Sequence, residues 1–104
     1  GCATIITSVF QTIMNVVDFD MRAQQGVNAR KAHSQWQPDL VMLERGTLSV
    51  PCMIGLMRRG HRLYAWPRFK YELGRVEAVL IGDDGARRGA ADYVRGKDDR
   101  AIGF

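Results

Sequence analysis

Side chains that could act as bases or nucleophiles are few in this chain and widely separated. It contains two histidines, His33 and His61, and two cysteines, Cys2 and Cys52. His33 would be either a base or metal ligand, or a loop histidine packed on Trp36 and hydrogen-bonded locally; we favour the second interpretation. His61 follows an expected helix end, where a structural role is again the simpler interpretation.

The two cysteines are expected in different surroundings. Cys52 lies among apolar residues of an expected helix, and we predict a small buried side chain there. Cys2 lies where a strongly predicted helix begins, a position at which thiol pKa values tend to fall. No base is evident near Cys2, so we do not favour a catalytic thiol. The spacing of the two cysteines fits neither a disulfide framework nor a zinc site.

One carboxylate pair is present, but no complete catalytic motif. Asp83 and Asp84 could bind a metal, yet the sequence Gly-Asp-Asp-Gly at residues 82–85 is typical of a hairpin turn, which we favour. The chain has no G-x-S-x-G, H-E-x-x-H or P-loop motif. We therefore expect no metal, no cofactor, and no nucleophile with a partnered base.

The strongest secondary-structure signal is a helix at residues 5–17, where apolar residues repeat every four positions on two adjacent stripes. Such a helix is apolar over most of its surface and needs covering by other segments. A shorter helix is expected at residues 21–28, capped by Asp20, with Ala23 and Val27 facing inward.

A third helix is expected at residues 49–59, with Pro51 in its first turn, Leu56 and Met57 facing inward, and Gly60 just past its end. Residues 28–39 are expected to form a loop and residues 66–74 an irregular segment. Strands are expected at residues 40–43, 61–65, 75–81 and 86–91, the last two forming a hairpin. This order predicts an α+β fold, with helices layered on a mainly antiparallel sheet.

Length and charge restrict the class of protein. The 104 residues suffice for one modest domain, and 46% hydrophobic with 25% charged residues is ordinary for a globular chain. The net charge is +4, but arginines alternate with acidic and apolar residues, so we favour a generally basic surface over a nucleic-acid site. No apolar run reaches the ~20 residues of a membrane span, and none reads as a signal peptide.

Several motifs follow one another in a recognisable order. Residues 1–11 read G-x-x-T-I-I-T-S-V-x-Q, residues 25–29 read Q-x-V-N-A, and residues 33–39 read H-x-Q-W-x-P-D. The series resembles the C-terminal part of the γ-glutamyltranspeptidase small subunit, whose patterns are approximately GSPGG-x-x-IITTVLQ and NAPR-x-H-x-QW-x-PD. Weaker similarities continue at residues 56–63, 74–81, 89–92 and 101–104.

The resemblance implies that residues 1–104 are a single partial domain, part of a four-layer αββα N-terminal-nucleophile hydrolase sandwich. In that family a threonine attacks the γ-glutamyl amide of glutathione or a related compound, and the acyl group passes to water or an amino acid. That threonine lies upstream of the position matching Gly1, so this chain lacks the nucleophile. The implied partners are the large subunit and the N-terminal part of the small subunit, and the implied location is periplasmic or extracellular.

Gly1 and Cys2 match the two adjacent glycines whose backbone N–H groups bind the oxyanion in that family. The abrupt start of the apolar helix is therefore expected to be a cut through this loop. A cysteine retains the N–H but loses glycine's backbone freedom. The chain departs from the family pattern elsewhere too, with Arg30 in place of a proline and with Pro51 in the third helix.

Three functions are compatible with the sequence. The first is a C-terminal fragment of a γ-glutamyltranspeptidase-like enzyme, inactive and molten when alone. The second is a non-catalytic remnant or structural module. The third, a basic nucleic-acid-binding domain, explains the fewest residues, because the motif series accounts for far more of the chain than its charge does.

Overall fold

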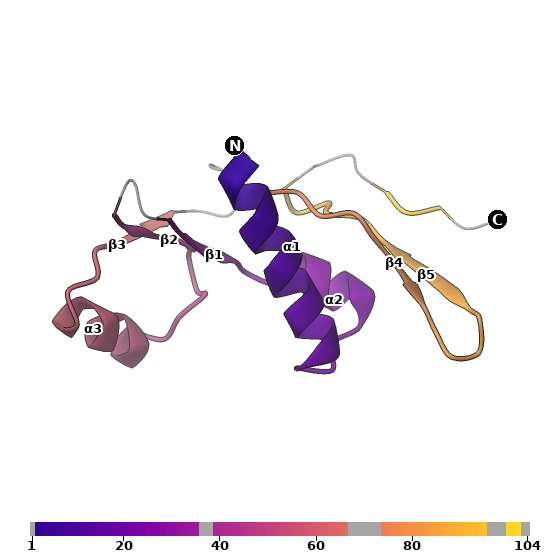
Figure 1. Ribbon diagram of the computed structural model, residues 1–104, viewed down its shortest axis with the longest axis horizontal. Helices are drawn as coiled ribbons and strands as arrows, with labels where there is room; N and C mark the ends of the chain where they lie inside the picture. Colours follow the sequence, from indigo (N-terminus) through magenta and orange to yellow (C-terminus); the bar gives the residue numbers. More distant parts are fainter. Residues whose placement is uncertain (1, 36–38, 67–73, 96–99, 103–104) are drawn as a thin grey trace.

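The computed structural model describes residues 2–35, 39–66, 74–95 and 100–102, with the side chains of Cys2 and Trp66 left out. These residues form three helices and five strands, which confirms an α+β fold. A central helix separates a small three-stranded sheet from a two-stranded hairpin (Figure 1). In chain order the elements are α1 (Cys2–Val17), α2 (Ala23–Asn28), β1 (Ala32–Ser34), β2 (Val41–Glu44), α3 (Val50–Arg58), β3 (Leu63–Trp66), β4 (Ala78–Ile81) and β5 (Arg87–Ala90).

Helix α1 turns its small polar residues, not its apolar ones, toward the rest of the described chain. Ser8 and Thr12 are buried, whereas Ile6 and Phe10 are 73% and 60% exposed. Small side chains on the inner face allow close approach: a methyl group added at Gly74 would lie 2.7 Å from the Ser8 hydroxyl. The predicted helix is thus confirmed, and its apolar stripes face away from the described residues.

Helix α2 begins two residues later than predicted. Asp20 adopts a positive φ of 56°, so it bends the chain and does not cap the helix. The cap is Arg22, whose backbone N–H donates to the Gln25 side chain at 3.0 Å. Ala23 and Val27 are buried, as predicted, and form a small core with Val76 and Ala90.

The three-stranded sheet has the order β1-β2-β3 and contains both kinds of pairing. β1 pairs antiparallel with β2, and β2 pairs parallel with β3. The parallel pair requires a crossover, which α3 provides. Of the three strand pairings in the described residues, two are antiparallel, as predicted, and the β2–β3 pairing is parallel. One prediction was wrong here, because residues 32–34 form a strand inside the expected loop. Neither apolar alternation nor length marks a three-residue strand in the sequence.

Helix α3 starts and ends as predicted, but it does not face inward. Its cap residue Ser49 accepts a hydrogen bond from the Cys52 backbone N–H at 3.4 Å, Pro51 lies in the first turn, and Gly60 has φ +90°. No residue of α3 is buried. Met57 is 53% exposed, which contradicts its predicted inward position. Helix α3 lies at one end of the molecule, where the other described elements do not bury it (Figure 1).

The hairpin of β4 and β5 has the predicted alternation. Val79 and Ile81 are exposed, whereas Ala78 and Leu80 pack against the small core. The regular strand begins at Ala78, so residues 75–77 are not part of it. In the connecting turn, the Asp84 carboxylate accepts a hydrogen bond from the Ala86 backbone N–H at 3.0 Å. This bond favours the turn over the metal-pair interpretation.

Candidate functional site

The positions expected to bind an oxyanion lie at the start of α1. Cys2 is the first residue of that helix, and Gly1 lies outside the described residues. The first backbone N–H groups of a helix have no intrahelical partner and lie at the positive end of its dipole. The backbone around Cys2 therefore has the donor geometry expected of an anion-stabilising corner, while the role itself stays a prediction.

His33 is buried, with 3% of its surface exposed, and both of its ring nitrogens have hydrogen-bond partners. Its Nδ1 lies 2.7 Å from the Thr7 hydroxyl oxygen, and its Nε2 lies 2.7 Å from Gln35 Oε1. These contacts support the structural interpretation that we favoured. The position differs from the prediction, since His33 lies on β1 and bonds to α1, while the expected neighbour Trp36 lies outside the described residues.

A second pair of hydrogen bonds also joins α1 to β1. The Gln11 side chain donates to the Ala32 carbonyl oxygen at 2.6 Å and accepts from the Ala32 N–H at 2.9 Å. We name the set Thr7, Gln11, Ala32, His33 and Gln35 the α1–β1 junction. All of its side chains except Ala32 belong to the motifs that carried the family resemblance.

The junction corrects one prediction. We expected no nucleophile beside a base, but the Thr7 hydroxyl lies within hydrogen-bond distance of an imidazole. Such a pair is the core of many acyl-transfer sites. Its third member, Gln35, is an amide and carries no negative charge to stabilise an imidazolium. The burial of His33 also keeps substrate from its ring. We therefore interpret the junction as a connection between elements.

Sequence reasoning missed a buried ionic cluster formed by Glu44, Asp92 and Arg95. Arg95 Nε lies 2.7 Å from Glu44 Oε1, and its Nη2 lies 2.7 Å from Glu44 Oε2, which makes the pair bidentate. Arg95 Nη1 lies 2.8 Å from Asp92 Oδ2. All three side chains are inaccessible to solvent.

The cluster also satisfies backbone groups from several elements. Arg95 donates to the carbonyl oxygens of Val27 and Ala29 at the end of α2, at 3.2 and 3.0 Å. The buried Lys31 donates to Val27 as well, at 2.7 Å, and the Lys31 backbone N–H donates to Glu44 at 2.9 Å. These mutual bonds make the cluster a structural bracket between α2, β2 and the turn after β5.

Burial alone would lower the pKa of Arg95, because it disfavours the charged form. Hydrogen bonding and charge from Glu44, and then from Asp92, outweigh that effect, so the pKa of Arg95 is raised above its ordinary value. The guanidinium is thus charged at any physiological pH. No sequence signal marks the cluster, because Asp92 and Arg95 lie in a polar tail and Glu44 ends a short strand.

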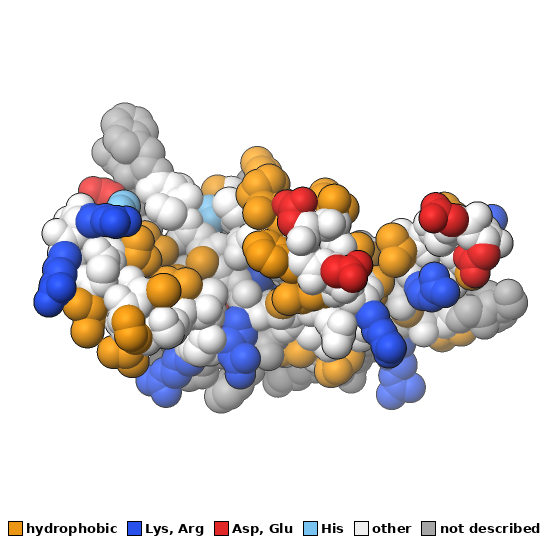
Figure 2. Space-filling view, turned by 90° about the horizontal axis from the view of Figure 1, so that it is seen from below, with side chains coloured by type: hydrophobic (Ala, Val, Ile, Leu, Met, Phe, Trp, Pro, Cys, Tyr) orange, Lys and Arg blue, Asp and Glu red, His pale blue; other side chains and the backbone are white. Residues whose placement is uncertain are grey.

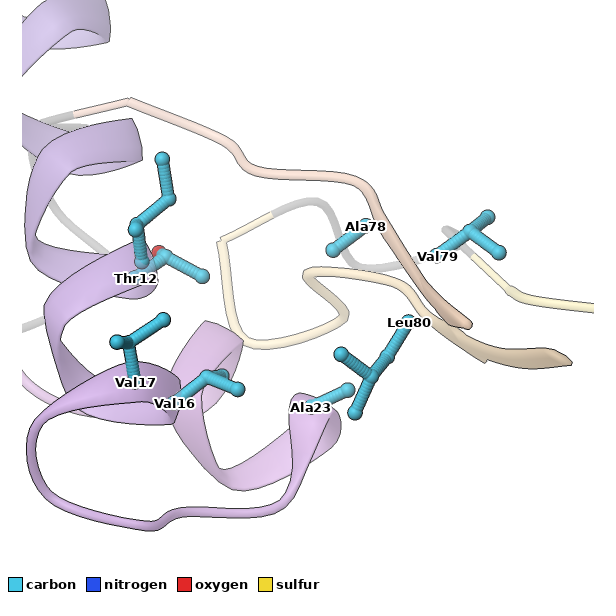
Figure 3. A pocket seen from close by; sticks show the side chains of 8 residues that line it. Thr12, Val16, Val17, Ala23, Ala78, Val79 and Leu80 are labelled. Atoms are coloured by element: carbon cyan, nitrogen blue, oxygen red, sulfur yellow. The ribbon is translucent and has the colours of Figure 1, made fainter. Parts of the chain in front are cut away.

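An apolar pocket of about 190 Å³ lies between α1, α2 and β4 (Figure 3). Its lining is Thr12, Ile13, Val16, Val17, Ala23, Ala78, Val79 and Leu80. The Thr12 hydroxyl donates to the Ser8 carbonyl oxygen at 2.9 Å, so it is already engaged. The pocket therefore offers packing surface and no group for chemistry.

The other groups singled out in the sequence can be located within the described residues. Cys52 is exposed, contrary to its predicted burial, because no element covers α3. The described residues contain no group of three or more His, Cys, Asp or Glu side chains placed to hold a metal ion. No described helix combines the length and apolarity that a membrane crossing needs. On the face in Figure 2, lysine and arginine side chains lie in several places along the molecule and do not form one continuous patch.

Comparison with known proteins gives one consistent family. The family model described as gamma-glutamyltranspeptidase matches residues 1–102. The glutathione hydrolase proenzyme of Escherichia coli (strain K12) is 31% identical over 104 residues, which is 100% of this chain and 17% of that protein. This chain thus spans less than a fifth of that relative's length.

Two solved structures agree with that match. A mutant of Helicobacter pylori γ-glutamyltranspeptidase has a TM-score of 0.73 and 30% identity, and the match covers 88% of this chain and 48% of that chain. The γ-glutamyltranspeptidase of Pseudomonas nitroreducens, complexed with L-DON, has a TM-score of 0.75 and 25% identity, covering 97% of this chain and 49% of that chain.

Proposed function

Since the chain belongs to the γ-glutamyltranspeptidase family, we propose that it supplies the C-terminal part of the small subunit of an enzyme that transfers or hydrolyses γ-glutamyl groups. The observation that carries the proposal is the family match over residues 1–102, combined with coverage of only 17% of the Escherichia coli relative. The substrate class would be glutathione and related γ-glutamyl compounds.

The chain needs a partner, and α1 is the surface that the partner covers. In the described residues, Ile5, Ile6, Phe10, Ile13 and Val17 are each more than half exposed. An exposed helix face as apolar as this one is unusual on the surface of a complete folded protein. The occupant we propose is the remainder of the γ-glutamyltranspeptidase-like protein, and the assembled fold would be the four-layer αββα sandwich.

The nucleophile would come from that partner. A threonine oxygen attacks the γ-carbonyl carbon, the C–N bond breaks, and the leaving amine takes a proton. Water or the amine of an amino acid then attacks the acyl-enzyme and releases the threonine hydroxyl. The contribution of this chain would be the pair of backbone N–H groups at Gly1 and Cys2, which stabilise the oxyanion at the start of α1.

The test compares the chain alone with the chain co-expressed with the remaining part of a γ-glutamyltranspeptidase, using γ-glutamyl p-nitroanilide as substrate. We expect no turnover alone and turnover in the complex. Within the complex, Cys2→Pro removes the backbone donor together with the thiol, and proline itself is tolerated in the first turn of a helix. We expect its kcat to fall by roughly 10²–10³-fold.

The matched controls are Cys2→Gly and Cys2→Ala, which retain the N–H and should retain kcat. Loss of turnover in Cys2→Ala would assign the chemistry to the thiol instead. A stable complex without turnover would favour the non-catalytic module. Turnover by the chain alone would contradict the need for a partner.

A further inference from the structure

Helix α1 is held to β1 by polar bonds near its middle. Thr7 and Gln11 lie one helical turn apart and therefore face the same side of the helix. Thr7 bonds to the His33 ring at 2.7 Å, and the Gln11 side chain bonds to the backbone N–H and carbonyl oxygen of Ala32 as well as to the Thr7 carbonyl oxygen of its own helix. The second half of α1 is held separately, since Asn15 donates to the Gly26 carbonyl oxygen of α2 at 3.4 Å.

The apolar side chains of the first two turns of α1 contribute little to the attachment, since Ile6, for example, is 73% exposed. The inner face approaches the chain closely at Ser8, beside Gly74, and Ser8 and Thr4 have polar interactions of their own. The α1–β1 junction is a directional restraint on this part of α1, because its hydrogen bonds fix orientation as well as distance.

The hydrogen-bond pattern indicates which ring nitrogen of His33 donates and which accepts. Gln35 presents its carbonyl oxygen to His33, so the Nε2 of His33 carries a hydrogen. In the neutral ring, Nδ1 is then the acceptor, and the one Thr7 hydroxyl hydrogen is shared between this nitrogen at 2.7 Å and the Thr4 carbonyl oxygen at 3.2 Å. The shorter contact to His33 is the one that joins the elements.

We propose that His33 is a positioning residue, which holds the Thr7 hydroxyl from β1 and thereby fixes the first two turns of α1, where the Cys2 N–H of the proposed oxyanion site lies. The inference rests on the proposed function for its catalytic consequence, although the positioning itself does not. A displacement of about 1 Å at a reacting group can cost roughly 10²-fold in rate. A hydrogen bond several residues from the reacting atoms would therefore control kcat.

The experiment uses two pairs of matched variants. Thr7→Val removes the hydroxyl while keeping the shape, and Thr7→Ser keeps the hydroxyl. His33→Asn keeps a polar group near the Nδ1 position that faces Thr7, whereas His33→Gln keeps one near the Nε2 position that faces Gln35. The control is Thr12→Val, because the Thr12 hydroxyl is buried on the same helix but bonds only within it.

In the co-expressed enzyme, we expect kcat for γ-glutamyl p-nitroanilide to fall by about tenfold or more in Thr7→Val and His33→Gln, with KM little changed. His33→Asn and Thr7→Ser should recover most of the rate. Glutamine is nearer to histidine in size, so a role in packing alone would reverse the order of the two His33 variants and overturn the proposal.

A second measurement, on the co-expressed complex, does not depend on activity. Amide hydrogen exchange at residues 5–8 should quicken at least tenfold in Thr7→Val relative to Thr12→Val. Equal exchange in the two would overturn the positioning role. If the unmodified complex has no turnover, the proposed function fails, and the exchange result still decides the positioning. Turnover by the lone chain that Thr7→Val alone abolishes would instead make Thr7 a nucleophile, contradicting the proposal.

Discussion

At the scale of single residues, the described structure depends most on charges that are buried together. Arg95 is enclosed with Glu44 and Asp92, and all of these side chains are removed from solvent. The gain from each ion pair is offset by the cost of desolvating both partners. Removing one partner destabilises the fold, because it leaves the other side chains charged and buried.

Arg95→Met should therefore lower the free energy of unfolding by about 3–5 kcal/mol. The measurement is the midpoint of urea unfolding of the co-expressed complex, followed by circular dichroism, with Arg87→Met on the exposed strand β5 as the control, expected within about 0.5 kcal/mol. A raised pKa means that the contribution of Arg95 is present below its unfolded value and is lost only as pH rises through the folded value. The difference between the variants should thus stay constant from about pH 6 to 10, and equal midpoints for both would contradict the bracket.

At the scale of elements, α1 is placed by close approach to backbone as much as by side-chain packing. Gly74 has φ +150°, and an added Cβ would lie 2.7 Å from the Ser8 hydroxyl and 3.0 Å from the Thr4 carbonyl oxygen. Gly55, in the middle of α3, has no atom within 4 Å of the same construction. A side chain at residue 74 would therefore meet neighbouring atoms and an unfavourable backbone conformation, whereas a side chain at residue 55 would meet neither.

Gly74→Ala should destabilise the chain by about 1–3 kcal/mol, since it strains the backbone and pushes against α1. Gly55→Ala should stabilise it by about 0.5–1 kcal/mol, because alanine is the better helix former and meets no obstacle. Urea unfolding of both variants in the co-expressed complex checks the pair. If Gly74→Ala proved as stable as the unmodified chain, α1 would not be packed against residue 74.

At the scale of the whole molecule, the exposed apolar face of α1 is the main departure from an ordinary protein surface. The apolar pocket between α1, α2 and β4 adds to it, because its lining presents further apolar surface. The measured extents of 49 × 27 × 22 Å describe an elongated body whose described core is small. Such a body is expected to associate through its uncovered helix.

The paired substitution Ile6→Glu and Phe10→Glu should reduce self-association of the lone chain in analytical ultracentrifugation and reduce its binding of the dye ANS. The same change should weaken co-purification with the remaining part of the enzyme at least tenfold, since it places two charges in the proposed interface. Met57→Glu, on the exposed helix α3, is the control and should leave co-purification unchanged. Equal effects of both changes would show that α1 is not the specific contact surface.

The sequence by itself determined the helices and the hairpin, because those elements follow from local periodicity, caps and turn residues. The stripes at residues 5–17, Pro51 and Gly60 around α3, and Gly-Asp-Asp-Gly before β5 each act through neighbours in the chain. The ordered motifs also indicated the γ-glutamyltranspeptidase family, which the match over residues 1–102 confirmed.

Only the tertiary structure decided which residues meet across the chain. The bonds from Thr7 to His33 and from Glu44 to Arg95 join residues 26 and 51 positions apart. The short strand β1 and the parallel pair of β2 and β3 depend on such distant partners too. The direction in which α1 faces was decided in the same way, since a helix apolar on most sides carries no local signal for which side its neighbours will cover.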